Sequence, residues 1–172
     1  MELTPERLDN TKKNFATLIS ALEKRKLKYN IQSNEPDRPH VVLSFTGEDL
    51  PLSLHIVLWS DRQVVSILSA MPFHINENRR MEAALAVTHA NQGLIDGSFD
   101  LNMQNGELRF RLTSTYMGTA MTEEAFLYMI YTSADTIDRY NDRFMLVNTG
   151  ALSVEEFVAA DRKPTDAPHE EA

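Results

Sequence analysis

The side chains in this sequence that could do chemistry form no recognised catalytic or metal-binding pattern. No pair of histidines has the spacing of metal ligands with a carboxylate between them, and the chain contains no cysteine. We therefore expect no metal centre, no disulfide and no thiolate catalysis. We interpret each histidine as a surface residue or as one with a structural partner. The five histidines are His40, His55, His74, His89 and His169.

Carboxylates, glycines and serines offer little more. Asp96 and Asp100 are close enough in the sequence to be considered as an acid–base pair. Asp96, however, stands where turns commonly use aspartate, and Asp100 is expected to pair with Arg111 across a hairpin. The six glycines form no phosphate-binding loop. A nucleophile-elbow pattern is absent around Ser66, Ser69 and Ser114. We predict a protein that is not an enzyme and needs no cofactor.

The stretch from Gly97 to Tyr116 is predicted to form a β-hairpin, around which the rest of the chain is organised. Asn105 and Gly106 are the pair that a two-residue type I′ turn favours, because both residues tolerate a positive φ. This turn places Asp100 opposite Arg111. Alternation of side chains along the two strands then puts six apolar residues on one buried face. These residues are Phe99, Leu101, Met103, Leu108, Phe110 and Leu112.

Helices are predicted from capping residues and apolar periodicity. The first begins at Thr4 and Pro5, and the basic run from Lys24 to Lys28 is interpreted as its C-terminal end rather than as a phosphate-binding patch. Further helices are expected from 77 to about 92 with Asn76 as the cap, from Thr122 to Asn141, and after a capping box at Ser153–Glu156.

Strand-like runs lie between the first two helices, over 29–33, 41–46, 52–59 and 64–70. The predicted order is therefore α-β-β-β(-β)-α-β-β-α, followed by a short helix. We expect a single α+β domain over 1–160, in which helices flank an antiparallel sheet. The polar segment 161–172 is expected to be a disordered tail.

Composition excludes several classes of protein. The 172 residues are 42% hydrophobic and 24% charged, which is ordinary for a soluble domain. The formal net charge of −8 disfavours a nucleic-acid partner. No apolar run reaches the length that spans a bilayer, and the first residues lack the pattern of a signal peptide. We expect a cytoplasmic protein that does not insert into a membrane.

The sequence resembles the YbjN-like family of bacterial sensory transduction regulators, whose fold is similar to that of type III secretion chaperones. The resemblance covers about residues 1–140. It implies a small, acidic homodimer that holds a segment of a partner polypeptide. The residues that carry it are Ala90-Asn91, Gly97-Ser98-Phe99, Asn105-Gly106, Leu108-Arg109-Phe110 and Thr122.

Candidate binding residues come from a strand with two different faces. In the run 52–59, one set of alternating side chains is apolar, whereas the other mixes Ser53 with His55, Val57 and Trp59. Such a mixed face is a candidate contact surface, unless a helix or the edge of the core covers it. Flexible side chains after the hairpin add two candidates, Met117 and Met121.

Three functions remain open at this point. The first is a non-enzymatic protein-binding module, an adaptor or chaperone-like homodimer. The second is a regulatory domain that senses a small molecule in a pocket between the sheet and the helices. The third, held in reserve, is a metal-free enzyme.

Overall fold

The computed structural model of the protein describes residues 2–46 and 51–161. Its helices and strands follow the predicted order, and the α+β fold class is confirmed. The predicted tail lies, from residue 162 onward, outside the described residues. The elements are α1 (Pro5–Lys24), β1 (Tyr29–Ser33), β2 (His40–Thr46), β3 (Pro51–Trp59), β4 (Val64–His74), a 3-10 helix η1 (Glu77–Arg79), α2 (Arg80–Gln92), β5 (Ser98–Leu101), β6 (Glu107–Thr115), α3 (Glu123–Thr149) and α4 (Val154–Asp161).

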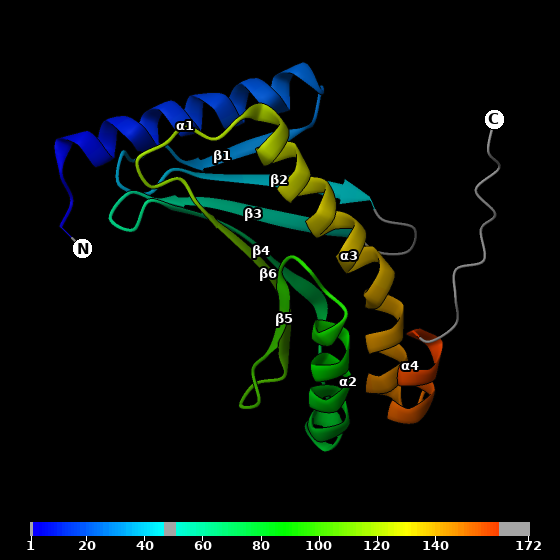
Figure 1. Cartoon of the computed structure of the whole chain (residues 1–172). Helices are drawn as coiled ribbons and strands as arrows, with labels where there is room; N and C mark the ends of the chain where they lie inside the picture. The colour runs from blue at the N-terminus through cyan, green and yellow to red at the C-terminus, as the bar shows by residue number, and fades with distance from the viewer. Residues whose placement is uncertain (1, 47–50, 162–172) are drawn as a thin grey trace.

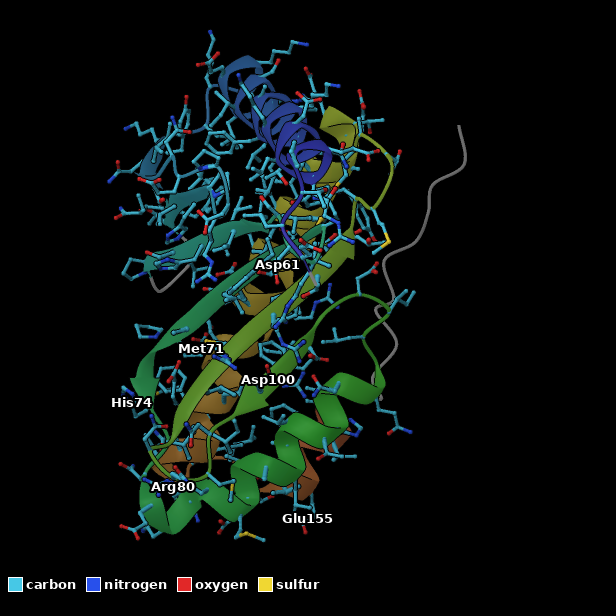
Figure 2. The ribbon with its side chains drawn as sticks, turned by 90° about the vertical axis from the view of Figure 1, so that its left-hand side faces the viewer. Asp61, Met71, His74, Arg80, Asp100 and Glu155 are labelled. Carbon is cyan, nitrogen blue, oxygen red and sulfur yellow. The ribbon has the colours of Figure 1, made fainter. Side chains whose placement is uncertain are left out.

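The described strands form one antiparallel sheet of six strands in the order β1-β2-β3-β4-β6-β5. Helix α3 contacts α1, β3, β4 and β6, so it crosses the middle of the sheet (Figure 1). Helix α2 packs against β5, α3 and α4. Figure 2 views the sheet from the side opposite α3, with the ribbons of β4 and β6 in front of that helix. One face of the sheet is therefore covered by helices, and none of the described helices covers the other, which we call the open face.

The core fills the space between the sheet and the helices. Aromatic rings dominate the part of the core between β5, α3 and α4. The ring centroids of Phe99 in β5 and Phe144 in α3 are 5.0 Å apart. Phe144 lies 5.4 Å from Phe157 of α4. Aromatic pairs contribute more than their buried area alone, so these rings join the hairpin, the long helix and the last helix into one unit.

The hairpin forms at the predicted place, but the predicted two-residue turn is wrong. Asn102 N–H donates to the Glu107 carbonyl, and Gly106 N–H donates to the Asn102 carbonyl, both at 2.8 Å. The loop therefore has four residues, 103–106. Only its last residue has a positive φ, 78°. The side chain of Asn105 instead accepts a hydrogen bond from Glu107 N–H, which favours the longer loop.

The longer loop shifts the register by two residues, so Phe99 faces Phe110 rather than Leu112. A shift of two preserves the faces, and Phe99, Leu108, Phe110 and Leu112 are buried, whereas Leu101 is partly buried. Met103, the sixth predicted core residue, lies in the loop and is 43% exposed.

The outer edge of β5 is closed by a side chain of α2. The amide nitrogen of Asn91 donates to the Phe99 carbonyl at 2.9 Å, and the Phe99 N–H donates to the amide oxygen of Asn91 at 2.7 Å. Phe99 thus has both of its outward backbone groups satisfied. Asn91 was noted in the sequence only as part of the family pattern.

One predicted cap and one predicted helix end are wrong. The helical segment begins at Glu77, with η1 leading into α2, but the side chain of Asn76 makes no cap. Its N–H donates instead to the side chain of Asn148, because the end of α3 lies against this turn. Asn141 does not end α3, which continues to Thr149 with Gly150 as its C-cap. The apolar periodicity also continues, since Phe144 and Val147 are fully buried.

Other predicted ends are confirmed. Thr4 accepts a hydrogen bond from Arg7 N–H at the start of α1, and Thr122 accepts one from Ala125 N–H at the start of α3. The capping box of α4 forms in both directions between Ser153 and Glu156. These local signals are read correctly because they depend only on neighbours in the sequence.

Gly106→Ala should destabilise the fold strongly. An added Cβ would lie 2.2 Å from the Ile75 carbonyl oxygen, at a residue whose φ is 78°. We expect a loss of about 2–4 kcal/mol in the free energy of unfolding, from the backbone strain and the clash together. Urea denaturation followed by circular dichroism measures it. Gly118→Ala is the matched control, because its φ is 66° but nothing lies within 4 Å of the new atom. Equal losses in the two variants would contradict this account of the loop.

Candidate functional site

The candidate site is the open face of the sheet, made by side chains of β2, β3, β4 and β6 that point away from the helices. Strand pairing sets its members side by side: Val57 lies opposite His40 on one side and opposite Ser66 on the other. Residues directly opposite in antiparallel strands share a face. The open face consists of His40, Val42, His55, Val57, Trp59, Val64, Ser66, Leu68, Arg109, Arg111 and Thr113.

Trp59 is held at one end of the open face. Its indole N–H donates to the Ser66 hydroxyl at 2.9 Å. The guanidinium carbon of Arg38 lies 4.3 Å from the centre of the ring, and that of Arg62 lies 5.8 Å from it. These distances allow cation–π attraction. The indole is therefore fixed in orientation while remaining half-buried.

Beside Trp59 the open face is hollowed into a shallow depression of about 290 Å³. Its lining combines apolar side chains of β3 and β4 with guanidinium and hydroxyl groups. Such a mixture of apolar and polar groups is the composition that binding surfaces use. The depression is lined by Trp59, Arg62, Val64, Ser66, Leu68, Arg109, Arg111 and Thr113.

The predicted ion pair between Asp100 and Arg111 is present, although the two residues are diagonal rather than opposite. Arg111 Nε donates to Asp100 Oδ2 at 2.9 Å, and a second guanidinium nitrogen donates to Oδ1 at 3.3 Å. Arg109 Nε lies 3.7 Å from the same carboxylate. The hydrogen bond to Asp100 raises the pKa of the Arg111 guanidinium.

Strands β2 and β3 bring two histidines together. His40 Nε2 and His55 Nδ1 are 3.1 Å apart, and their ring centroids are 5.3 Å apart. Burial lowers the pKa of His40 below its ordinary value of 6.5, and the neighbouring charge of His55 lowers it further. Sequence reasoning missed this pair because the residues lie on different strands. The predicted antiparallel order of those strands was the signal that could have found it.

Three of the five predicted binding residues, His55, Val57 and Trp59, lie together on the open face, and none of the described helices covers them. Met117 and Met121 do not lie on this face. Met117 is 55% exposed after β6. Met121 is partly buried and packs against the core. The structure therefore separates the predicted residues into a strand group and two methionines near α1.

The other methionines differ in their exposure. Met103, predicted on the buried face of the hairpin, is 43% exposed, and Met81 is 69% exposed. Met129 is buried. Apolar type alone does not determine burial, because Met81 lies on the outer side of α2.

The carboxylates considered for acid–base chemistry have separate partners. Asp96 accepts a hydrogen bond from the Tyr128 hydroxyl, and this bond raises the pKa of Tyr128. Asp100 is bound by Arg111. Among residues 2–46 and 51–161, no group of three or more His, Asp or Glu side chains is arranged to hold a metal ion.

A second depression, of about 390 Å³, lies where α1 begins, and Met117 lines it together with Asn10 and Gln63. The polar side chains here bond to one another. The amide nitrogen of Asn10 donates to the Gln63 side-chain oxygen at 2.7 Å, and the Gln63 amide nitrogen donates to the Arg7 carbonyl and the Thr11 hydroxyl. These contacts fasten α1 to the turn between β3 and β4.

Comparison with known proteins decides the family. The family model described as "Putative bacterial sensory transduction regulator", YbjN, matches residues 14–145. The protein belongs to the YbjN family. This family assignment and its description as a regulator agree with the resemblance found in the sequence.

A solved structure supports the same fold. The crystal structure described as that of "YbjN, a putative transcription regulator from E. coli" has a TM-score of 0.58 to this YbjN-family chain, at 14% sequence identity. The alignment covers 81% of this chain and 94% of that one. No curated protein matches the sequence. In the described part of the chain, none of the helices has the length and apolar character needed to cross a membrane.

The His40–His55 pair predicts a pH dependence. Because the folded state lowers the pKa of His40, the unfolded chain binds more protons between that lowered value and 6.5. The free energy of unfolding should therefore fall as the pH falls through this window.

An NMR titration of the imidazole resonances should give His40 a pKa below 6.5. His55→Gln should raise it part of the way, since burial remains. His74→Gln, at the far end of β4, is the control. An unchanged His40 titration in His55→Gln would contradict the interaction.

Proposed function

We propose that this YbjN-family protein is a non-enzymatic, cytoplasmic adaptor that binds a segment of another protein on the open face of its sheet. The observation that carries the proposal is the pair of partly exposed apolar side chains, Trp59 and Leu68, on a face that no described helix covers. Val57 lies between them and is only 9% exposed. The family description as a sensory transduction regulator supports a regulatory role.

Exposing apolar side chains on a sheet face to water costs free energy. Antiparallel sheets with one solvated face normally carry polar side chains there. Here Trp59 of β3 and Val64 and Leu68 of β4 are partly exposed on that face, beside the buried Val57. Covering apolar surface contributes about 25 cal/mol per Å², and tryptophan is one of the residues on which binding energy concentrates. A bound polypeptide would remove this surface from water.

We also propose that the protein is a homodimer, as the resemblance to chaperone-like proteins implies. Strand β1 is an edge of the sheet, and its Ile31 is 43% exposed. An edge strand offers unpaired backbone groups to a second strand. Pairing of two β1 strands about a two-fold axis would extend the sheet across two copies and join their open faces.

A small-molecule sensor is the second candidate, and the depression at the start of α1 favours it. Its polar side chains, however, already satisfy one another through Asn10, Gln63 and Thr11. The open face presents arginine and apolar groups with fewer internal partners, so protein binding is the better supported function.

Capture experiments test the binding surface. The full-length protein, used as bait in a lysate of its own organism, should retain a partner in stoichiometric amount. Trp59→Ala and Leu68→Gln should each weaken binding of that partner, once purified, by about thirtyfold or about 2 kcal/mol. Tyr131→Ala is the matched control, because Tyr131 is 40% exposed on α3. Equal binding by all variants would contradict the proposal.

Light scattering after size exclusion tests the dimer. The wild-type protein should have twice the mass of one chain. Ile31→Lys places a charge on the β1 edge and should shift the equilibrium to monomer. Met81→Lys, which alters a more exposed apolar residue on α2, should leave the dimer intact. A wild-type protein of monomer mass at all concentrations would exclude this arrangement.

A further inference from the structure

The charge of the open face differs in sign from that of the whole chain. The chain has a formal net charge of −8. Around Trp59, however, four arginines lie on or beside the open face, and three of them line the depression. They come from the loop before β2, the turn between β3 and β4, and strand β6. The four are Arg38, Arg62, Arg109 and Arg111.

The nearby carboxylates neutralise only part of this charge. Asp61 lies 3.7 Å from Arg62, and Asp100 takes both hydrogen bonds of Arg111. Arg109 is 3.7 Å from the same Asp100, which Arg111 already holds more closely. Within the described residues, Arg38 has no ion pair and stacks on Trp59. Three of the guanidinium groups thus share two carboxylates, and Arg38 pairs with neither.

The position of these charges restricts what the depression can bind. The guanidinium groups share the lining of the depression with the apolar side chains of Val64 and Leu68 and with the indole ring. A guanidinium group binds a carboxylate with paired hydrogen bonds, and it does so more strongly than it binds a neutral group. A ligand that combines an apolar side chain with neighbouring carboxylates would satisfy both parts of the depression.

We propose that the segment bound on the open face is acidic and apolar. An aromatic or aliphatic side chain of the partner packs against Trp59 and Leu68, and flanking Asp or Glu side chains bind Arg62 and Arg109. This inference rests on the proposed function and adds the chemistry of the partner to it.

An acidic polypeptide fits the depression better than a nucleic acid. A chain of net charge −8 repels a continuous phosphate backbone at long range. Single-stranded nucleic acids also bind on rows of aromatic side chains, whereas this chain has one tryptophan and the depression contains no other aromatic residue.

Selection from a display library of short random peptides tests the proposal with the full-length protein as bait. The enriched peptides should carry Asp or Glu beside an aromatic or aliphatic residue, in excess over the starting library. Fluorescence anisotropy should then show about tenfold weaker binding of the best peptide to the variant Arg62→Gln/Arg109→Gln. It should show a similar loss when the acidic residues of the peptide are replaced by their amides.

Two control variants distinguish the effect of losing charge from the effect of damaging the fold. Arg139→Gln removes an arginine from the exposed side of α3 and should leave peptide affinity unchanged. Arg62→Lys/Arg109→Lys keeps both charges and should recover part of the affinity lost in the glutamine variant. Circular dichroism confirms that all variants keep the wild-type melting temperature within a few degrees.

The outcomes distinguish this inference from the function on which it rests. Enriched peptides that need Trp59 but show no acidic excess would overturn the acidic partner and leave protein binding intact. A failure to enrich any peptide that depends on Trp59 would contradict both. Selective enrichment of a random single-stranded RNA pool, with no acidic peptide bound, would overturn the inference in favour of a nucleic acid.

Discussion

The structure depends on the contact between the hairpin and the last two helices, made by Phe99, Phe144 and Phe157. Phe99 comes from a four-residue strand, which could not be stable alone. Its ring contacts Phe144 of α3, and Phe144 contacts Phe157 of α4. Because α3 also packs on β3, β4 and α1, this aromatic chain joins the two ends of the fold. It keeps the helices on one side of the sheet and so leaves the opposite side open.

The open face is a consequence of that arrangement. A single layer of helices covers one set of alternating side chains, and no described helix covers the other set. In the central strands this second set includes the partly exposed Trp59 and Leu68 and the buried Val57. Arginines of β6 and of two loops lie near the tryptophan.

Local signals in the sequence predicted much of the fold. Caps such as Thr4 and Thr122 act on the next three residues, and strand alternation acts on the next two, so neither needs knowledge of distant contacts. The loop length was predicted wrongly because it depends on Ile75, a residue just after the end of β4, whose N–H donates to the Gly106 carbonyl. The end of α3 was predicted wrongly because Asn141 was chosen on its residue type alone. Buried side chains continue along the helix beyond Asn141.

The candidate site was predicted only in part, for the same reason. Alternation along β3 identified His55, Val57 and Trp59 as one set. It could not show that His40 meets His55, because that contact depends on the register of two strands. Nor could it show Arg38 lying over Trp59, since a loop residue has no periodicity to reveal its direction.

The side chain of Asn91 has a consequence for how copies of the chain can associate. By occupying both outward backbone groups of Phe99, it leaves the β5 edge with fewer groups to offer a neighbouring strand. Strand β1 lies at the other end of the strand order, and no described side chain occupies its outward backbone groups in this way. If two copies pair through β1, as proposed, the joined sheet ends in two partly occupied β5 edges, which disfavours growth into a filament.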